Sequence, residues 1–411
     1  MSDGDVAPRG SAGGQAGSVD VRALSALTEA ISGGAGLPAV VRAASKALGA
    51  SLILTDRSGA VIAAAAKSPA DERSLLRGGD DVRTIELRVA DTSVGRLRVR
   101  VTEAGTEPLL ALLSTLIASE VERVHAPERA SEEAATAFVR TVTSGGADDG
   151  NGLLATAREL GLDLGAGVGV LVVRAHPRAT TDDDWRARLL ALTRRGARSA
   201  SSAALAAPLR DDADEVLAIY ADADGEAGRR VGAAVLRELE AGIPGFAFAL
   251  GRSRRISAPR ELRRACDEAL LAVNVVEGDP EREELPFESA GTYQLLLPHM
   301  RDPGELRRFY EETVRPLVAY DQQYETDLLG TLSTFLECDA SVNATAARLI
   351  THRHTVRYRF ERVRELTGLD VQSTDGREQL SLGLKAMRVL GIAPPRGPAS
   401  EPGAEGGRVP R

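Results

Sequence analysis

The sequence predicts a multidomain α+β protein, with an α+β domain, then an α/β domain, then an all-α domain. Three patterns support this division. Apolar and polar residues alternate with period two between 51 and 101, strand and helix patterns alternate between 151 and 280, and apolar residues recur at helical spacing between 290 and 391. The 411 residues leave room for two to four domains, and 43% hydrophobic residues can fill their cores.

Composition excludes several classes of protein. The net charge of −8 rules out a chain coated all over with charge for nucleic acid, but it allows one basic module. Only two cysteines occur, Cys266 and Cys338, without CxxC spacing, which excludes a disulfide framework and a cysteine-rich zinc site. We expect two small buried thiols and no cofactor.

Neither a secretory signal nor a membrane span is evident in the sequence. The N-terminus is acidic, and the longest apolar stretch, 109–118, is about half the length that a bilayer requires. We therefore expect a cytoplasmic protein without a membrane partner. The ends, 1–18 and 393–411, are rich in small residues or in Pro, Gly and Glu, and we expect them to be disordered tails.

Residues 19–107 form the first predicted domain. Two helices are expected, over 21–31 and 37–48. Four strands follow, over 51–56, 60–63, 84–89 and 94–101, the first two joined by the turn Asp56-Arg57-Ser58-Gly59. The alternation indicates an antiparallel sheet with one solvent-exposed face. Helices followed by such a sheet resemble a GAF-like sensory domain; a purely structural domain is the alternative.

Residues 108–150 form a predicted helical linker. Leucine, isoleucine and valine recur at helical spacing from Leu109 to Val121, and we expect Pro127 to divide the helix. The linker could form a dimer-forming rod, or simply pack on the preceding sheet, and these interpretations are compatible. The Gly- and Asp-rich segment 144–150 predicts a break.

Residues 151–280 form the second predicted domain. The expected strands are 167–173, 203–209, 215–221 and 246–251, and the expected helices are 183–195, 228–239 and 260–275. Pro208 makes its strand an edge strand or one that bends late. This order fits a ferredoxin-like or nucleotide-cyclase-like fold.

One hairpin of this domain is where an enzyme could lie. Nucleotidyl cyclases of the GGDEF type carry Gly-Gly-Asp-Glu-Phe there, and the segment here reads Asp212-Ala213-Asp214-Glu215-Val216. Both glycines that let the backbone approach the nucleotide are replaced, one by a carboxylate that would repel phosphate. We interpret the domain as degenerate and the protein as no enzyme, with Asp214 and Glu215 as solvated charges. The alternative is a nucleotide-binding or cyclase-type enzyme that uses this acidic pair.

The remaining residues are predicted to be helical, with connecting helices over 281–325 and a helix-turn-helix domain over 326–392. A helix over 303–314 should bury Leu306, Phe309 and Val314 and end near Pro316. Further helices are expected over 326–338, 342–349 and 353–366, with a tight turn at Ile350-Thr351-His352 and a stop at Thr367-Gly368.

The charge of the last two of these helices differs from that of the whole chain. Between Ser341 and Gly368 six arginines face two acids, so this segment carries +4 and the rest of the chain −12. A short helix, a tight turn and a longer helix with outward arginines are typical of a DNA-binding helix-turn-helix. The alternatives are a solvated arginine face or a protein-binding module.

A helical wheel of 353–366 separates two faces. Val356, Phe360, Val363 and Leu366 form one buried stripe. Arg359 falls within the span of that stripe, and we expect its guanidinium to reach outward past the core edge. The residues predicted to contact DNA are Arg353, His354, Thr355, Arg357, Tyr358, Arg359 and Arg362. His352 and His354 lack a third ligand nearby, so no metal site is predicted.

Several motifs in residues 327–391 resemble the C-terminal helix-turn-helix of PucR/CdaR-family transcriptional regulators. They are Ala344-Thr345-Ala346, the segment His352–Phe360 and Glu365-Leu366-Thr367-Gly368-Leu369-Asp370. Here His354 replaces the usual Asn, Thr351 an apolar residue and Phe360 a Leu. The middle region resembles the degenerate GGDEF-like domain common in that family. The resemblance implies a bacterial transcription factor that binds promoter DNA as a dimer or higher homo-oligomer, with an effector acting on upstream domains.

Overall fold

The computed structural model describes residues 21–392 except 58, 79–80, 91, 101–106, 146–149, 180–183, 211–213, 278 and 280–281, and without the side chains of 21–24, 127–129, 150 and 151. Both predicted tails, 1–18 and 393–411, lie outside the described residues. The chain divides into two compact units, residues 1–130 and 131–411.

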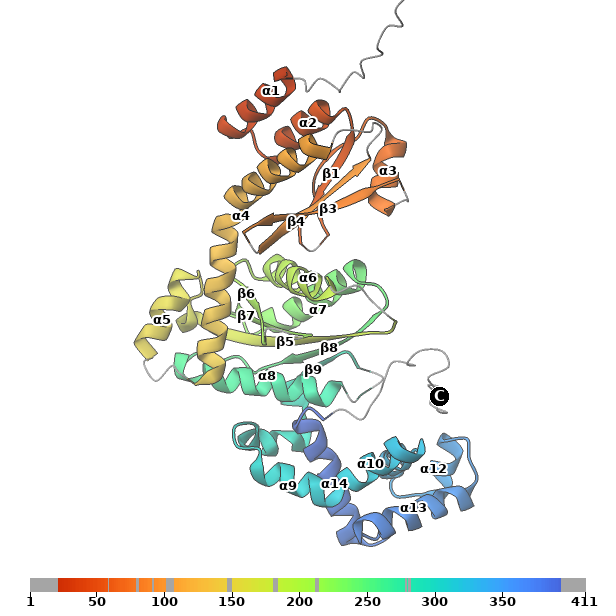
Figure 1. Cartoon of the computed structure of the whole chain (residues 1–411). Coiled ribbons are helices and arrows are strands. Elements are labelled where there is room, and N and C mark those ends of the chain that lie inside the picture. The colour runs from red at the N-terminus through yellow and green to blue at the C-terminus, as the bar shows by residue number, and fades with distance from the viewer. Residues whose placement is uncertain are drawn as a thin grey trace, which may run out of the picture. The chain divides into compact units, whose positions relative to one another are not determined.

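The first unit is a sheet with helices packed on it (Figure 1). Helices α1 (Val21–Ser32) and α2 (Leu37–Leu48) precede four antiparallel strands in the order β2-β1-β4-β3. The strands are β1 (Ser51–Thr55), β2 (Val61–Ala65), β3 (Arg83–Val89) and β4 (Thr92–Arg100). These elements confirm the predicted helices and strands. Apolar side chains of α1, α2, β1, β4 and the first part of α4 (Glu107–Ser144) form one core.

The opposite face of this sheet carries a helix that the sequence analysis missed. Helix α3 (Pro69–Arg77) begins at Ser68, whose side chain accepts a hydrogen bond from the Asp71 N–H at 3.1 Å. Its Leu75 is fully buried, and every residue of β1 is buried. The predicted solvent-exposed face is therefore wrong at β1, because α3 packs on it, while β3 keeps mostly exposed residues.

Helix α4 runs through Pro127 without a break, so the predicted division of this helix is wrong. A proline removes one backbone hydrogen bond, and packing elsewhere along a helix can offset that loss. Here Ile117 and Val121 are buried before the proline, and Phe138 and Val139 are buried after it. Helix α4 ends at Ser144 and α5 (Gly150–Glu159) begins at Gly150, and most of the predicted break over 144–150 lies outside the described residues.

The first part of the second unit is a five-stranded sheet in the order β6-β7-β5-β8-β9. Its elements are β5 (Val168–Pro177), α6 (Trp185–Ala200), β6 (Leu205–Pro208), β7 (Glu215–Ala221), α7 (Ala227–Gly242), β8 (Phe246–Arg252), α8 (Leu262–Val276) and β9 (Glu284–Pro286). All predicted strands and helices are confirmed, and Pro208 lies in an edge strand as expected. Helix α5 and strand β9 were not anticipated.

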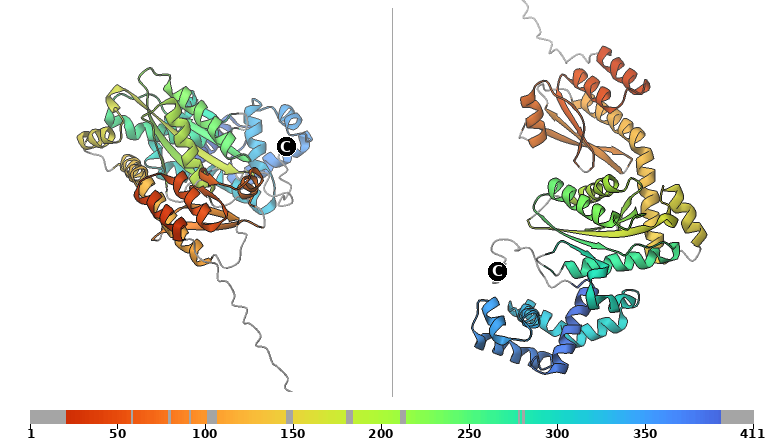
Figure 2. Two further views of the ribbon diagram at one scale, coloured as in Figure 1. Left: turned by 90° about the horizontal axis from the view of Figure 1, so that it is seen from above. Right: turned by 180° about the vertical axis from the view of Figure 1, so that it is seen from behind.

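This sheet is covered on both faces (Figures 1 and 2). Leu171 and Val173 of β5 pack with α6 and α7 on one face. Val170 and Val172 pack with α8, α5 and the end of α4 on the other. Successive side chains of a strand point to opposite faces, so the apolar first part of β5, residues 168–173, contributes to two cores.

Helices complete the second unit. A 3₁₀ segment η4 (Gly291–Met300) leads into α9 (Gly304–Thr313), α10 (Arg315–Tyr324), α11 (Leu328–Glu337), α12 (Val342–Arg348), α13 (Arg353–Thr367) and α14 (Thr374–Val389). Leu306 and Val314 are buried as predicted, whereas Phe309 is only partly buried, and Pro316 lies in the first turn of α10. In the ranges described, no helix combines the length and apolarity that a bilayer span requires.

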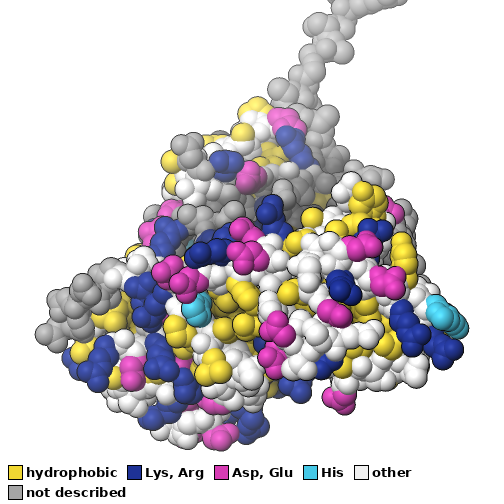
Figure 3. All heavy atoms as spheres, turned by 90° about the horizontal axis from the view of Figure 1, so that it is seen from below, with side chains coloured by type: hydrophobic (Ala, Val, Ile, Leu, Met, Phe, Trp, Pro, Cys, Tyr) yellow, Lys and Arg dark blue, Asp and Glu magenta, His cyan; other side chains and the backbone are white. Residues whose placement is uncertain are grey.

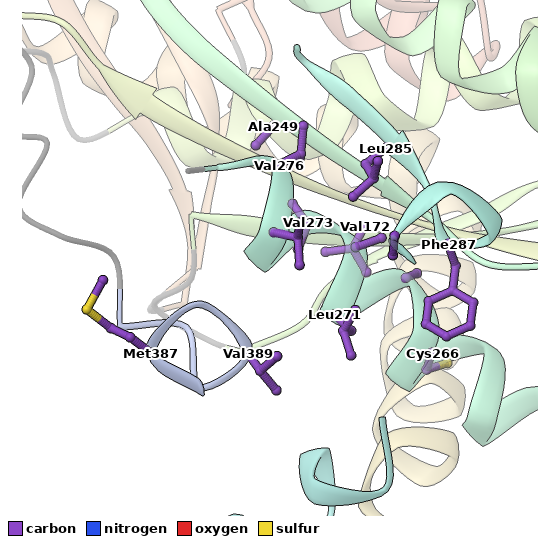
Figure 4. Close-up of a cluster of buried hydrophobic side chains, with 14 of the residues drawn as sticks. Val172, Ala249, Cys266, Leu271, Val273, Val276, Leu285, Phe287, Met387 and Val389 are labelled. Carbon is purple, nitrogen blue, oxygen red and sulfur yellow. The ribbon is translucent and has the colours of Figure 1, made fainter. Parts of the chain in front are cut away.

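The sheet domain and the C-terminal helices share one core. Met387 and Val389 of α14 belong to the same buried cluster as Leu271 and Val273 of α8, and Figure 4 shows Val389, at the end of α14, on the side of α8 that carries Leu271. Asn274 of α8 donates a hydrogen bond to the Val389 carbonyl at 3.0 Å. Cys266 of α8 is buried as predicted, which raises its pKa, whereas Cys338 is only partly buried.

The close approach of β8 to α8 gives a test of this packing. A Cβ atom at Gly251 would lie 2.2 Å from both the Ala269 carbonyl oxygen and the Val273 nitrogen. We expect Gly251→Ala to lower the free energy of unfolding by about 3 kcal/mol, because a strand and a helix must separate. Denaturant titration would measure this loss. Gly304→Ala, whose Cβ meets only Asp302 Oδ1 at 3.5 Å, is the control and should remain near wild type.

Candidate nucleic-acid interface

The start of α11 is fixed by a buried carboxylate that the sequence analysis did not single out. Asp321 of α10 is 5% exposed and accepts hydrogen bonds from the N–H groups of Leu328 and Leu329 at 2.8 and 2.9 Å. The Thr326 hydroxyl donates a third at 2.6 Å. Asp321 thus satisfies two of the amide groups that a helix leaves unpaired at its first turn, and it sets the angle between α10 and α11.

A short helix and a strained turn lead to α13. The Ser341 side chain caps α12 by accepting from the Ala344 N–H at 3.3 Å, as its position before the helix predicts. At the other end, Ile350 N–H donates to Ala347 O at 3.2 Å and Thr351 N–H donates to Ala346 O at 2.9 Å. This is a Schellman motif, and Ile350 occupies its left-handed position, with φ of 51°.

Ile350 is an unfavourable residue for that position. A β-branched side chain crowds the backbone when φ is positive, and glycine is the usual residue there. The Ile350 side chain is 86% exposed, so no packing offsets the strain. The turn therefore retains an exposed apolar side chain beside the α13 N-terminus.

Helix α13 has the two faces that the sequence predicts. Val356, Phe360 and Val363 are 0, 5 and 0% exposed, which confirms the buried stripe, and Leu366 is partly buried. The Phe360 ring packs edge-on against Phe335 of α11, with centroids 4.6 Å apart. This contact fixes the rotation of α13 about its own axis.

The opposite face of α13 is exposed over its first two turns. Arg353, His354, Thr355, Arg357 and Tyr358 are all exposed, Tyr358 by 61%. The His352 side chain caps the helix by accepting from the His354 N–H at 3.3 Å, and the two imidazoles stack with centroids 5.0 Å apart. Figure 3 shows histidine side chains beside Lys and Arg side chains at the right edge of the view from below.

Two arginines of the predicted DNA-contacting set, Arg359 and Arg362, interact with neighbouring side chains. Arg362 lies 5.4 Å over the Tyr320 ring of α10 and pairs with Glu365 at 2.7 Å. A hydrogen bond with Tyr358, then the Glu365 charge, raises the pKa of Arg362. Arg359 points inward, because its Nη1 donates to the buried Thr331 Oγ1 at 2.6 Å. The expectation that its guanidinium reaches outward is therefore wrong.

The hairpin between β6 and β7 differs from the prediction at Glu215. Asp212 and Ala213 lie outside the described residues. Glu215, expected to be solvated, is 3% exposed and accepts from Arg174 Nε at 2.7 Å. Burial acts to lower the pKa of Arg174, but the charges of Glu215 and Glu277 raise it. A guanidinium thus neutralises the carboxylate that a cyclase would use to hold a metal ion.

Comparison with known families identifies the C-terminal helices. Residues 328–386, which hold α11 to α13 and most of α14, match the family model of the PucR C-terminal helix-turn-helix domain. The chain carries a PucR-type helix-turn-helix. Residues 144–275 match the model of a GGDEF-like domain, so the PucR-type helix-turn-helix follows a GGDEF-like region. The resemblance to PucR/CdaR regulators is confirmed by these two matches.

Curated relatives match parts of the chain. The purine catabolism regulatory protein of Bacillus subtilis is 38% identical over 21% of this chain and 16% of its own length. The proline-responsive transcriptional activator PutR of the same organism is 28% identical over 31% of each chain. The match therefore spans less than a third of either relative. A solved regulator of polyketide synthase expression from Bifidobacterium adolescentis aligns over 62% of this chain at 18% identity, with a TM-score of 0.31.

The strain at Ile350 generates a prediction. We expect Ile350→Gly to raise the free energy of unfolding by about 0.5–1 kcal/mol, because glycine adopts a positive φ freely although it also adds entropy to the unfolded chain. Chemical denaturation would measure the gain. Ile350→Ala removes the exposed side chain but keeps a Cβ atom, so it should be less stable than the glycine variant. Equal stability of the two variants would contradict the assignment of strain.

Proposed function

We propose that this protein is a DNA-binding transcriptional regulator that places α13 in the major groove of promoter DNA. The observation that carries the proposal is the exposed cationic face of α13. Arg353 and Arg357 have no carboxylate within ion-pair distance in the described parts of the chain, while the helix is fixed from behind by Phe335. Unpaired guanidinium groups on a rigid helix suit phosphate and base contacts.

The residues of this face differ in their proposed roles. Arg357, His354 and Tyr358 lie on the outward face, where donors and acceptors can meet base edges. Arg353 and Thr355 lie in the first turn, where phosphate contacts are expected. Arg362 is oriented by Tyr320 and Tyr358, and we propose a backbone contact for it. Arg359 is not part of the proposed interface, because its guanidinium donates a hydrogen bond to Thr331.

The proposal extends to the assembly and to the upstream domains. Helix-turn-helix proteins commonly bind two half-sites through a dimer, so we propose a homodimer or higher homo-oligomer.

The helices and antiparallel sheet of residues 19–107 suit a GAF-like domain that senses an effector. The antiparallel order β6-β7-β5-β8 supports a ferredoxin/cyclase-like central domain over about 151–280. A promoter-binding protein acts where the chromosome lies, which in bacteria is the cytoplasm.

A cyclase is the alternative that this proposal sets aside. The observation against it is the buried pairing of Glu215 with Arg174, because a metal ion would have to displace a guanidinium in a buried site. We expect no cyclic or linear nucleotide product when the full chain is incubated with GTP and Mg²⁺. Product formation that Glu215→Gln abolishes would overturn the assignment as a non-enzyme.

Substitution of the two unpaired arginines tests the proposed interface. We expect the double variant Arg353→Ala/Arg357→Ala to lose at least about 100-fold in affinity for a retained promoter fragment, since each contact contributes about 1–3 kcal/mol. Its affinity should also depend less steeply on salt, because fewer counterions are released. Gel retardation over a series of salt concentrations measures both quantities.

The control is Arg364→Ala on the same helix, whose guanidinium faces Asp370 at 4.0 Å. It should stay within a few-fold of wild type, and all variants should keep the wild-type unfolding temperature. Unchanged affinity in the double variant would refute the proposed interface.

A further inference from the structure

A cavity lies between the sheet domain and the helix-turn-helix, inside the second compact unit. Its volume is about 560 Å³, which is within the range of small-molecule sites. The sheet domain contributes the end of α8, β9 and the following segment, while α11, α12 and α14 close the other side. Any molecule bound there would contact both domains.

One wall of the cavity is apolar, and polar or charged side chains make up most of the remaining lining. Val275, Val276, Leu285 and Ala290 are buried side chains of that wall. Ser289, Ser333 and Thr334 add hydroxyl groups. The apolar wall suits the apolar body of a ligand, and the polar side chains around it suit the polar atoms of that ligand.

Three arginines and two acids line the same cavity. Arg348 pairs with Glu337 at 3.1 Å, and Arg282 lies 3.7 Å from Asp279. Arg388 is half-buried, and its Nη1 donates to Tyr293 Oη at 3.1 Å. Among the residues that the structure describes, no carboxylate lies within ion-pair distance of Arg388. The described residues of the lining therefore carry an excess of one positive charge.

The excess positive charge on Arg388 determines which class of ligand the cavity favours. A guanidinium withdrawn from water without an anion is unfavourable, and a carboxylate offers it two parallel hydrogen bonds. Two of the arginines already have acidic partners, so one further negative charge completes the balance. A neutral ligand would leave Arg388 without an anion, and a highly charged one would bring uncompensated negative charge against the apolar wall.

We propose that this cavity binds a small organic monocarboxylate, with its acid group on Arg388 and its apolar body against Val276 and Leu285. Arg388 belongs to α14, next to Val389, whose carbonyl accepts from Asn274 of α8. Arg348 ends α12, directly before the turn that leads to α13. A bound ligand would thus fix the helix-turn-helix against the sheet domain. This regulatory consequence rests on the proposed function, whereas the binding site does not.

Thermal unfolding of the full chain tests the site without DNA. Sodium benzoate and sodium hexanoate are the probes, compared with sodium chloride at equal ionic strength and with benzamide, the neutral analogue of benzoate. We expect a probe to raise the unfolding temperature by several degrees and benzamide to have no effect. Stabilisation by neither probe beyond chloride, or equal stabilisation by benzamide, would overturn the proposal.

Variants locate the site. Arg388→Gln should lose most of the stabilisation, and Arg388→Lys should keep part of it because it keeps the charge. Arg308→Gln, an exposed arginine of α9 outside the cavity, is the matched control and should respond like wild type. Should Arg388→Gln fail to fold, Val276→Phe, which fills the apolar wall, and the exposed Arg282→Gln should each weaken binding several-fold, measured by calorimetry. Full stabilisation in the cavity variants would refute the site.

A second measurement separates this site from the proposed function. Benzoate should change the affinity of the chain for its promoter fragment by at least about fivefold, a coupling typical of two linked sites. Binding without any change in DNA affinity would refute the regulatory role alone. If the chain retains no DNA at all, the proposed function fails, while the unfolding experiment still decides the cavity.

Discussion

The packing of α13 on α11 is the constraint on which the proposed function depends. The Phe360–Phe335 contact and the two fully buried valines fix which side of α13 faces inward. The arginines at 353 and 357 then have to face outward, because a helix cannot turn without exposing that stripe. Asp321 adds to this by fixing the first turn of α11. The cationic face is therefore a consequence of a small apolar core.

That small core is continuous with a larger one. The cluster that contains Val356 and Phe360 also contains Val172 of the sheet and Leu271 of α8. Within this unit the helix-turn-helix is therefore packed against the sheet domain and is not a separate domain on a linker. Asn274 bonds both Arg174 in the sheet domain and the end of α14, at 2.9 and 3.0 Å. One side chain of α8 therefore connects Arg174 of the sheet domain with the end of α14.

The buried ion cluster gives the hairpin of the GGDEF-like region a structural role. Arg174 contacts Glu215, Glu277 and Asn274 inside the domain, so its charge is satisfied by the chain itself. Buried pairs of this kind give little net stability, but removing one partner is costly. The cluster therefore restricts the register between β5, β7 and α8, and it uses the acid that metal binding would need. The hairpin lacks the two glycines of the GGDEF motif, and it keeps Glu215 as the partner of Arg174. Both features fit a structural role for this hairpin.

The sequence by itself determined most of the helices and strands, because hydrophobic period and turn chemistry are local. It predicted the four strands of the first sheet, β7 to the residue, and the buried stripe of α13. It did not find α3 or the continuity of α4 through Pro127, since both depend on packing against distant residues. It also misjudged Glu215 and Arg359, whose partners Arg174 and Thr331 are 41 and 28 positions away. Only the tertiary structure decided which charged side chains are exposed to water and which are paired with a partner. The burial of a side chain depends on residues that are distant in the sequence and become its neighbours on folding.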